Sequence, residues 1–369
     1  MLSFKMAISR SSEVNLINPF STYPPEKPGR SRNSLKRNTS PRVLVTGADG
    51  LLGSNLVREL LHRDYVVRVL IHPSSLSLTL EGQPVERHLC DLLCDVSLIQ
   101  EAVSGCEYVI HCAAITDFWE DPDVTHSVNV LGTQKILDAC MREGINRFIY
   151  VGSASSFQYG TMDDPGNEEG GFPDVYKRIP YMQTKFKAMK LVKEYVRDKK
   201  IDAVIVAPTF MIGGFDSRPS SGETIRRFIN NDMKVTSPGG RNFVHVKDAA
   251  ESTVAALEKG KTGEVYILGG ENLSFLEFFS KVAKITRKKS PEWIIPKPLV
   301  RVGGFLGSIY EKVSKERMTL NGTIATCSCV QGYYSSEKAK KELGMRNTPI
   351  ESAIRDSICS LQEYGYIKR

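Results

Sequence analysis

The sequence predicts an α/β fold, a doubly wound parallel sheet with a smaller C-terminal cap. From Arg42 to about residue 210, short apolar segments alternate with segments in which apolar residues recur at helical spacing. Strands that alternate with helices form a parallel sheet covered on both faces. Beyond about residue 210 the alternation loosens, and loops with Gly and Pro separate the expected helices. This second part is therefore expected to cover the ends of the strands.

The expected elements follow one another along the chain. The first strand is the apolar run Val43–Val45, and a helix with apolar residues from Leu51 to Leu60 follows it. Further strands are expected at 66–71, 108–111, 147–151, 202–207 and 264–268, and helices at 96–104, 124–142, 181–198, 222–231, 247–258, 273–286, 297–314 and 350–364. We therefore divide the chain into a basic extension at 1–41, an α/β domain at 42–210 and a cap at 211–369, from which some segments return to the α/β core.

The composition is that of a globular protein. The 369 residues are 41% hydrophobic and 25% charged, and no stretch approaches the roughly 20 apolar residues of a membrane-spanning helix. The net charge is +7, but the first 42 residues hold eight basic and two acidic residues and so supply six of the seven charges. The remainder is nearly neutral, which predicts no nucleic-acid partner. The eight cysteines lack the nearby histidines of a zinc pattern, so no metal site is expected.

Residues 1–41 contain Ser, Asn, Pro and Arg with little hydrophobic periodicity, which predicts a disordered extension. The segment is basic and poor in acids, as organelle transit peptides are, and it lacks the apolar core of a secretory signal. Three interpretations stay open. The segment is a plain tail on a cytoplasmic protein, a transit peptide directed to a plastid or mitochondrion, or the result of a misplaced start codon.

A glycine motif, Gly47-x-x-Gly50-x-x-Gly53, follows the first strand and begins the first helix. Gly47 allows a tight turn, Gly50 lets the backbone approach a pyrophosphate, and Gly53 lets helix and strand pack closely. The free N–H groups of the helix N-terminus, at Leu51 and Leu52, face the phosphates. In this strand-turn-helix context the motif predicts that residues 42–210 bind a dinucleotide.

The end of the second strand bears on which dinucleotide binds. An enzyme committed to NAD usually has Asp or Glu here to hold the ribose 2′-hydroxyl. The run His72-Pro73-Ser74-Ser75 contains neither. His72 and the two serines are suited to a 2′-phosphate, so the sequence favours NADP over NAD. The alternative, that His72 is an ordinary exposed loop residue, leaves NAD open.

Two further strand ends carry candidate cofactor contacts. Asp91 and Leu92 follow an expected strand, where the Asp91 carboxylate would accept a hydrogen bond from the adenine amino group. Ala113 and Ala114 follow the fourth strand, and their small side chains would let the backbone line the cofactor. His111 ends the same strand, a position at which a lone histidine is usually structural.

A reactive pair is expected on the helix at 181–198. Tyr181 and Lys185 are four residues apart and so share one helix face. A nearby ammonium favours the phenolate, which would make Tyr181 a better acid and base near neutral pH. Lys185 would also hold the nicotinamide ribose. Ser153 follows the fifth strand, where its hydroxyl would hydrogen-bond a substrate oxygen beside Tyr181, and Ser155 is the alternative.

Together these motifs resemble the extended short-chain dehydrogenase/reductase superfamily, also described as NAD-dependent epimerase/dehydratases, from about residue 42 to the C-terminus. The resemblance is closest to the dihydroflavonol-4-reductase-like and hopanoid-associated epimerase-like branches. The motifs that carry it, in family order, are Thr46-Gly47-x-x-Gly50-x-x-Gly53, Asp91-Leu92, His111-x-Ala113-Ala114, Asn129-Val130-x-Gly132-Thr133, Ser153, Tyr181-x-x-x-Lys185, Pro208-Thr209, the run 242–250 and the run 266–272.

The resemblance implies a Rossmann fold and a triad in which Tyr181 is the acid/base, Ser153 polarises a carbonyl and Lys185 orients. It also implies that Pro208 packs near the nicotinamide. A homodimer formed by the helices at 124–142 and 181–198 is expected from the resemblance alone. The sequence departs from relatives at His72, where NADP-using members often have Arg, which keeps both cofactors under consideration.

Three functions are weighed. The leading hypothesis is hydride transfer between NAD(P) and a carbonyl or alcohol of a small hydrophobic substrate. The second is a nucleotide-sugar epimerase, and the third is a non-catalytic NAD(P)-binding protein. An apolar pocket would be lined by Phe118, Trp119, Phe157, Phe172 and Phe210, whereas a nucleotide diphosphate would be bound by Arg226, Arg227 and Arg241. Dehydration is not expected, because the run Ser153-Ala154-Ser155 has no acid to protonate a leaving hydroxyl.

Overall fold

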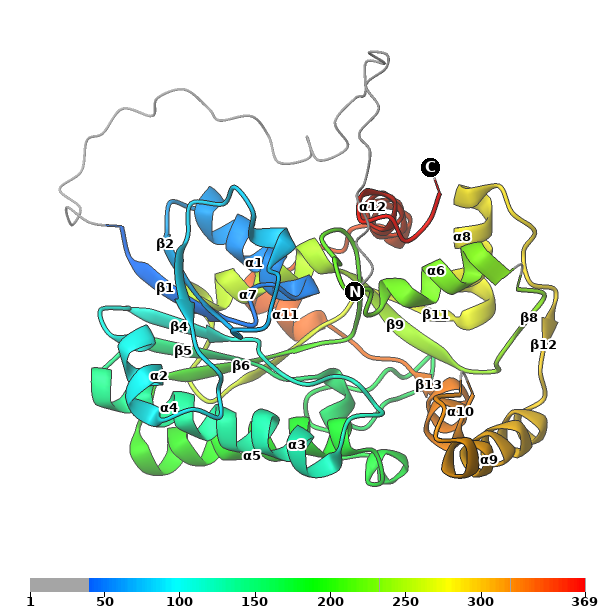
Figure 1. Cartoon of the computed structure of the whole chain (residues 1–369), viewed down its shortest axis with the longest axis horizontal. Helices are drawn as coiled ribbons and strands as arrows, with labels where there is room; N and C mark the ends of the chain where they lie inside the picture. Colours follow the sequence, from blue (N-terminus) through cyan, green and yellow to red (C-terminus); the bar gives the residue numbers. More distant parts are fainter. Residues whose placement is uncertain (1–39, 232, 319, 369) are drawn as a thin grey trace, which may run out of the picture. The chain divides into compact units, whose positions relative to one another are not determined.

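A central sheet of seven parallel strands forms the core of the computed structural model, which describes residues 40–231, 233–318 and 320–368 (Figure 1). Its strand order is β10-β6-β5-β4-β1-β2-β3. The strands are β1 (Arg42–Thr46), β2 (Val66–Ile71), β3 (Glu86–Leu89), β4 (Tyr108–His111), β5 (Arg147–Val151), β6 (Ala203–Pro208) and β10 (Val265–Leu268). The order reverses direction between β1 and β4, and ligands of such sheets bind at the carboxyl ends of the strands beside that reversal. The α/β prediction is confirmed.

Helices cover both faces of this sheet. One face carries α1 (Leu51–His62), α7 (Val246–Lys259) and α11 (Glu337–Leu343), which share one apolar core with alternate strand residues. The other face carries α2 (Val96–Val103), α4 (Gly132–Glu143) and α5 (Pro180–Lys199). The strand β10 and the helix α7 come from beyond residue 210, yet they lie in the α/β core. The other domain boundaries stay a prediction. Residues 1–39 of the predicted basic extension lie outside the described residues.

The cap contains strands that the sequence did not predict. A four-stranded sheet combines β7 (Phe210–Ile212), β9 (Gly240–His245), β11 (Glu271–Ser274) and β13 (Gln331–Gly332), and β8 (Val235–Thr236) pairs with β12 (Trp293–Ile294). The helices of the cap are α6 (Gly222–Asn231), α8 (Phe275–Thr286), α9 (Lys297–Ser314), α10 (Gly322–Ser328) and α12 (Ile350–Glu363). Its core is aromatic, with the rings of Phe243 and Phe278 stacked at a centroid distance of 4.1 Å. None of the helices in the described ranges is long and apolar enough to span a bilayer.

The helix expected at 124–142 is interrupted. It consists of α3 (Pro122–His126), a π-helical turn at Ser127–Leu131, and α4. A π turn inserts an extra residue into a helix, which shifts the side chains that follow, and such turns are frequent at functional sites. Here the turn places Asn129 between α5 and the segment that follows β4.

Candidate active site

Tyr181 and Ser153 meet at the carboxyl end of the sheet. Tyr181 lies in the first turn of α5, which begins at Pro180, a residue suited to a helix start because it lacks an N–H group. Ser153 follows β5 and caps the short 3₁₀ helix Ala154–Ser156, where its Oγ accepts a hydrogen bond from the backbone N–H of Ser155. The hydroxyl of Ser153 lies near the Tyr181 phenol and acts to lower its pKa. The alternative residue, Ser155, contacts Ser153, with 2.8 Å between the two hydroxyl oxygens.

The third predicted member, Lys185, is buried one helical turn further along α5. Its Nζ donates a hydrogen bond to the carbonyl oxygen of Val151 at 2.8 Å. Burial lowers the pKa of Lys185 to about 8, and the neighbouring thiol of Cys112 partly opposes this shift. The ammonium is therefore held against the end of β5, on the same helix face as Tyr181.

The ionisation expected for Tyr181 was wrong in direction. Burial raises the pKa of the Tyr181 phenol, and the nearby Ser153 hydroxyl only partly offsets this rise. Removing a phenolate from water costs more free energy than its neighbours return. The surroundings of Tyr181 therefore favour the protonated phenol over the phenolate.

The glycine motif has the geometry needed to hold a dinucleotide. Gly47 has a φ of +64°, and a Cβ there would lie 2.8 Å from the backbone of Ala113. A Cβ on Gly53 would lie 2.1 Å from the carbonyl oxygen of Gly47. Gly50 differs, because a Cβ there would meet only the carbonyl oxygen of Gly47, at 3.4 Å. No side chain caps the N-terminus of α1, which leaves the N–H groups of Leu51 and Leu52 available to phosphate oxygens.

The remaining predicted cofactor contacts lie at the same edge of the sheet. Ala113 donates its N–H to Thr46 Oγ1 at 3.2 Å, and the half-buried Ala114 follows it. Pro208 ends β6 and is buried. Asp91 and Leu92 follow β3, with Leu92 buried and the Asp91 side chain 44% exposed. The strand ends β1, β3, β4 and β6 thus supply these residues from segments far apart in the chain.

His111 is a structural residue within this edge. Its Nδ1 lies 2.7 Å from Thr46 Oγ1 and its Nε2 lies 3.0 Å from Thr133 Oγ1. Thr133 donates its own proton to the carbonyl oxygen of Asn129 at 2.7 Å, so it accepts the Nε2 proton of a neutral imidazole. Burial, reinforced by the charge of Lys185, lowers the pKa of His111 to about 3.

This shift predicts a loss of stability in mild acid. The unfolded histidine takes up a proton near pH 6.5 while the folded one does not, so His111 stabilises the fold fully above pH 6.5 and progressively less as the pH falls towards 3. Between pH 6.5 and 5 the free energy of unfolding should fall by about 2 kcal/mol from this group. Urea unfolding of the wild type and of His111→Gln between pH 6.5 and 5 measures this loss. If the free energy of unfolding falls equally with pH in both proteins, His111 is not its source.

Comparison with known proteins shows the family to which the chain belongs. A model of the NAD dependent epimerase/dehydratase family matches residues 43–269. The chain belongs to this family. It is therefore an NAD(P)-dependent enzyme of the extended short-chain dehydrogenase/reductase type. The matched segment includes the glycine motif, Ser153, Tyr181 and Lys185.

Individual relatives align over 70% to 89% of this chain. Sterol demethylase protein B of Methylococcus capsulatus is 30% identical over 88% of this chain and 99% of its own length. The bifunctional dihydroflavonol 4-reductase/flavanone 4-reductase of Malus domestica is 28% identical over 70% of this chain and 78% of its own. The crystal structure of gox2253 superposes with a TM-score of 0.79 at 30% identity, covering 89% of this chain and all of that one. These proteins share the fold and the family with this chain.

Within this epimerase/dehydratase site, Asn129 is a residue to which the sequence assigned no role. Its side-chain amide accepts from the backbone N–H of Ile115 at 2.7 Å and donates to the carbonyl oxygen of Ile115 at 2.9 Å and to Thr184 Oγ1 at 3.0 Å. Thr184 immediately precedes Lys185. The π turn therefore holds the segment after β4 against α5. The motif Asn129-Val130-x-Gly132-Thr133 was the feature of the sequence from which a role for Asn129 could have been predicted.

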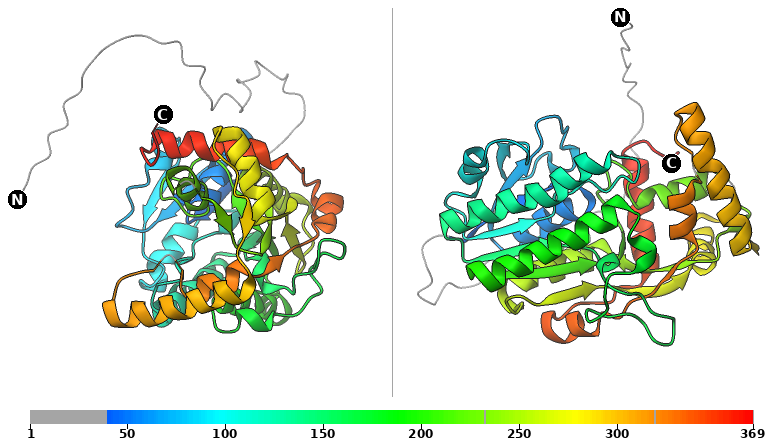
Figure 2. Two further views of the ribbon diagram at one scale, coloured as in Figure 1. Left: turned by 90° about the vertical axis from the view of Figure 1, so that its right-hand side faces the viewer. Right: turned by 90° about the horizontal axis from the view of Figure 1, so that it is seen from below.

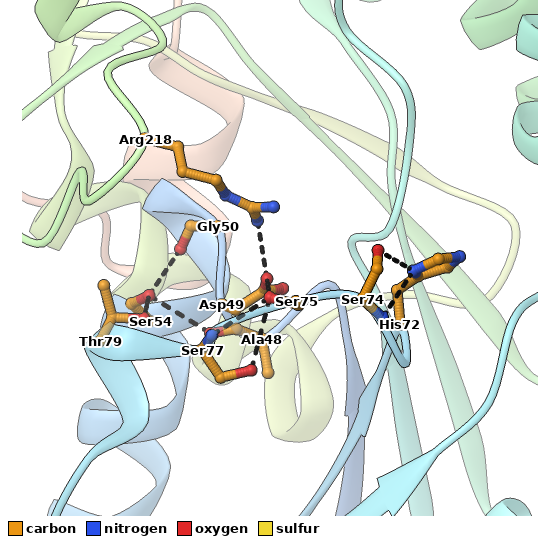
Figure 3. A network of polar contacts seen from close by, with 10 residues as sticks. All are labelled: Ala48, Asp49, Gly50, Ser54, His72, Ser74, Ser75, Ser77, Thr79 and Arg218. Atoms are coloured by element: carbon orange, nitrogen blue, oxygen red, sulfur yellow. Dashed lines mark hydrogen bonds and ion pairs between the residues drawn. The ribbon is translucent and has the colours of Figure 1, made fainter. Parts of the chain in front are cut away.

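Arg218 is a second residue of the site to which the sequence assigned no role. Its guanidinium pairs with the Asp49 carboxylate at 2.6 Å, and Ser75 donates a hydrogen bond to the same oxygen atom (Figure 3). Asp49 lies between Gly47 and Gly50, so Arg218 reaches from the cap to the glycine motif. His72 lies on the far side of Ser74, with its Nδ1 2.7 Å from Ser74 Oγ and its Nε2 3.6 Å from Asp91 Oδ2.

The aromatic residues expected to line a pocket divide into two groups. The ring of Phe118 lies 6.0 Å from that of Tyr181, and Phe172 belongs to the same apolar cluster. Phe157 and Phe210 instead pack into the cores of the α/β domain and the cap. Trp119 donates its Nε1 proton to Glu311 of α9 at 3.0 Å.

Proposed function

We propose that the protein is a reductase that uses NADPH to reduce a carbonyl group of a small apolar compound. The observation that carries this proposal is the half-buried Tyr181, whose pKa is raised, with Ser153 near its phenol and the ring of Phe118 beside it. A protonated phenol is suited to give a proton to a carbonyl oxygen, and an apolar ring beside it favours an uncharged substrate.

In this scheme the bound nicotinamide supplies a hydride to the carbonyl carbon. Ser153 donates a hydrogen bond to the carbonyl oxygen, and Tyr181 transfers its phenolic proton to that oxygen as the alcohol forms. Lys185 is held by Val151 on the same face of α5, where its ammonium stabilises the phenolate left behind and holds the nicotinamide ribose.

The contacts of the cap arginines do not favour a nucleotide-sugar epimerase. Arg226 and Arg227 both pair with Glu223. Arg241 donates to the backbone carbonyl oxygens of Cys327 and Val330. A diphosphate would have to displace these partners. A non-catalytic role is not favoured either, because Ser153, Tyr181 and Lys185 are all present at the strand ends.

Loss of NADPH absorbance in the presence of a panel of aromatic and aliphatic ketones and aldehydes tests the reaction. The proposal predicts turnover with at least one uncharged carbonyl compound and none with nucleotide sugars. Interconversion of a nucleotide sugar without net consumption of the cofactor would overturn it.

We also infer that NADPH is preferred over NADH, with Arg218 and the hydroxyl of Ser75 holding the 2′-phosphate. Arg218 is an exposed cation that reaches the cofactor edge, and Ser75 and Ser74 add hydroxyl donors there. The carboxylate of Asp49 is the present partner of Arg218 and would be exchanged for the phosphate.

Replacing Arg218 with Gln should therefore weaken NADPH binding roughly tenfold or more while changing NADH binding little, since one charge-assisted contact is lost. Fluorescence titration with each cofactor measures this. The matched control is Arg197→Gln, which removes an exposed arginine that pairs with Asp198 on α5. An equal loss of affinity for both cofactors would contradict the assignment of Arg218 to the 2′-phosphate.

A further inference from the structure

Helix α9 presents a row of large apolar side chains on the surface of the cap. These residues are between 46% and 80% exposed and recur every three or four positions, so they share one side of the helix. Two residues of β12, which leads into the helix, are similarly exposed. We define the apolar face as Trp293, Ile294, Leu299, Val302, Phe305, Leu306, Ile309, Tyr310 and Val313.

The opposite side of α9 makes the contacts that hold the helix in place. Val300, Gly304 and Gly307 are its buried residues. A Cβ on Gly304 would lie 2.3 Å from the side chain of Ala325 in α10, and a Cβ on Gly307 would lie 1.9 Å from the carbonyl oxygen of Leu320. Figures 1 and 2 show α9 on the outside of the cap with α10 on its inner side. Packing against α10 therefore explains the residues on the inner side of α9. The apolar face makes no such packing contact in the fold.

Most of the charges beside the apolar face are positive, although the exposed Glu292 precedes Trp293 and the exposed Glu316 accepts a hydrogen bond from the Tyr310 hydroxyl at 3.3 Å. Lys297, Arg301, Lys312 and Lys315 are exposed, and the helical repeat places them along one edge of the face. No ion pair joins these four to any residue in the described ranges. The one acidic residue of α9, Glu311, points inward and accepts hydrogen bonds from Trp119, Asn321 and the backbone of Met318.

We propose that the apolar face and its basic edge bind the surface of a membrane that contains anionic phospholipid. A helix with large apolar side chains on one side and lysine or arginine beside them lies in the plane of a bilayer, with the apolar side chains among the acyl chains. Each basic residue adds attraction to anionic headgroups. Trp293 and Tyr310 have the amphipathic rings that favour the headgroup level. Scattered exposed leucines need no explanation, but a contiguous apolar row does.

The same helix is connected to the active site. Glu311 holds Trp119, which follows Phe118, and Phe118 contacts Tyr181. Arg317, just beyond α9, pairs with Asp117 at 3.1 Å. A membrane bound at α9 would therefore lie against an element that contacts the segment 117–119 beside Tyr181, and an apolar substrate dissolved in the bilayer fits this arrangement. This last point rests on the proposed function, whereas the binding of the membrane does not.

Sedimentation of the full chain with vesicles tests the proposal. The experiment contains no substrate or cofactor, so the binding result does not depend on the proposed reaction. Vesicles of phosphatidylcholine alone are compared with vesicles that also contain phosphatidylglycerol. We expect binding to the anionic vesicles, reduced roughly tenfold or more by the double substitution Phe305→Ser and Leu306→Ser. Arg301→Gln combined with Lys312→Gln should reduce binding to the anionic vesicles roughly tenfold, and added salt should have the same effect.

Leu89→Ser is the matched control, because Leu89 is 64% exposed on the edge strand β3, outside the cap. It should bind vesicles as the wild type does, and circular dichroism establishes that all the variants are folded. Absence of vesicle binding by the wild type, or unchanged binding by the Phe305/Leu306 variant, would overturn the proposal. If the wild type is a dimer that binds no vesicles, and the Phe305/Leu306 variant is a monomer, the proposal is overturned. The apolar face would then bind a second copy of the chain.

Discussion

Replacing Tyr181 with Phe should lower kcat by about a thousandfold while leaving the dissociation constant of NADPH within about twofold of the wild-type value. The substitution removes only the phenolic hydroxyl, which in the proposed reaction gives its proton to the substrate oxygen, and a positioned acid contributes typically 10²–10⁴ in rate. The ring and its contact with Phe118 remain. Steady-state turnover and a fluorescence titration with NADPH separate the two effects.

Tyr150→Phe is the control for this experiment. Tyr150 is buried on β5, and its hydroxyl has no hydrogen-bond partner among the described residues. Removing that hydroxyl should therefore leave kcat within a few-fold of the wild-type value. Retention of full activity by Tyr181→Phe would contradict the catalytic role of Tyr181, because a bystander tyrosine would lose its hydroxyl without consequence.

Replacing Gly47 with Ala should lower the free energy of unfolding by about 3 kcal/mol and abolish detectable NADPH binding. The positive φ of Gly47 costs an alanine about 1–2 kcal/mol. The new methyl group would also lie 2.8 Å from the backbone of Ala113, so β1 and the segment after β4 would have to separate. Urea unfolding and NADPH titration measure the two losses.

Gly82→Ala separates these two causes. Gly82 has a φ of +69°, close to that of Gly47, but a Cβ there would meet no atom within 4 Å. This variant should lose only about 1 kcal/mol, from backbone strain, and should bind NADPH normally. Equal destabilisation by the two substitutions would show that the close approach to Ala113 contributes nothing.

The α/β core could be predicted because its signals are local. Buried parallel strands such as β1 and β6 are continuous apolar runs, and α1 repeats its apolar residues at helical spacing. The strands of the cap could not be predicted in this way. β13 has two residues, and it pairs with β9, which lies about 90 positions earlier in the chain. Such short strands are formed by contacts that no local pattern records.

The residues of the candidate site also divide into those that local sequence patterns predict and those that they do not. The glycine motif and the Tyr181–Lys185 spacing are short-range patterns, and the structure places these residues at one edge of the sheet. Arg218 reaches Asp49 across 169 positions, and nothing near Arg218 in the sequence indicates that contact. The pKa of Tyr181 was predicted in the wrong direction because spacing alone shows the neighbouring lysine but does not show burial, which dominates.

Parallel fluorescence titrations of the purified chain with NADPH and NADH test the central claim most directly. A saturable NADPH signal, at concentrations about tenfold lower than those needed for NADH, is the predicted result, because the glycine motif holds the pyrophosphate and Arg218 adds a contact that only NADPH can make. Tighter binding of NADH would contradict the assignment of the 2′-phosphate site. Binding of neither cofactor would contradict the dinucleotide-dependent reaction on which the proposed function depends.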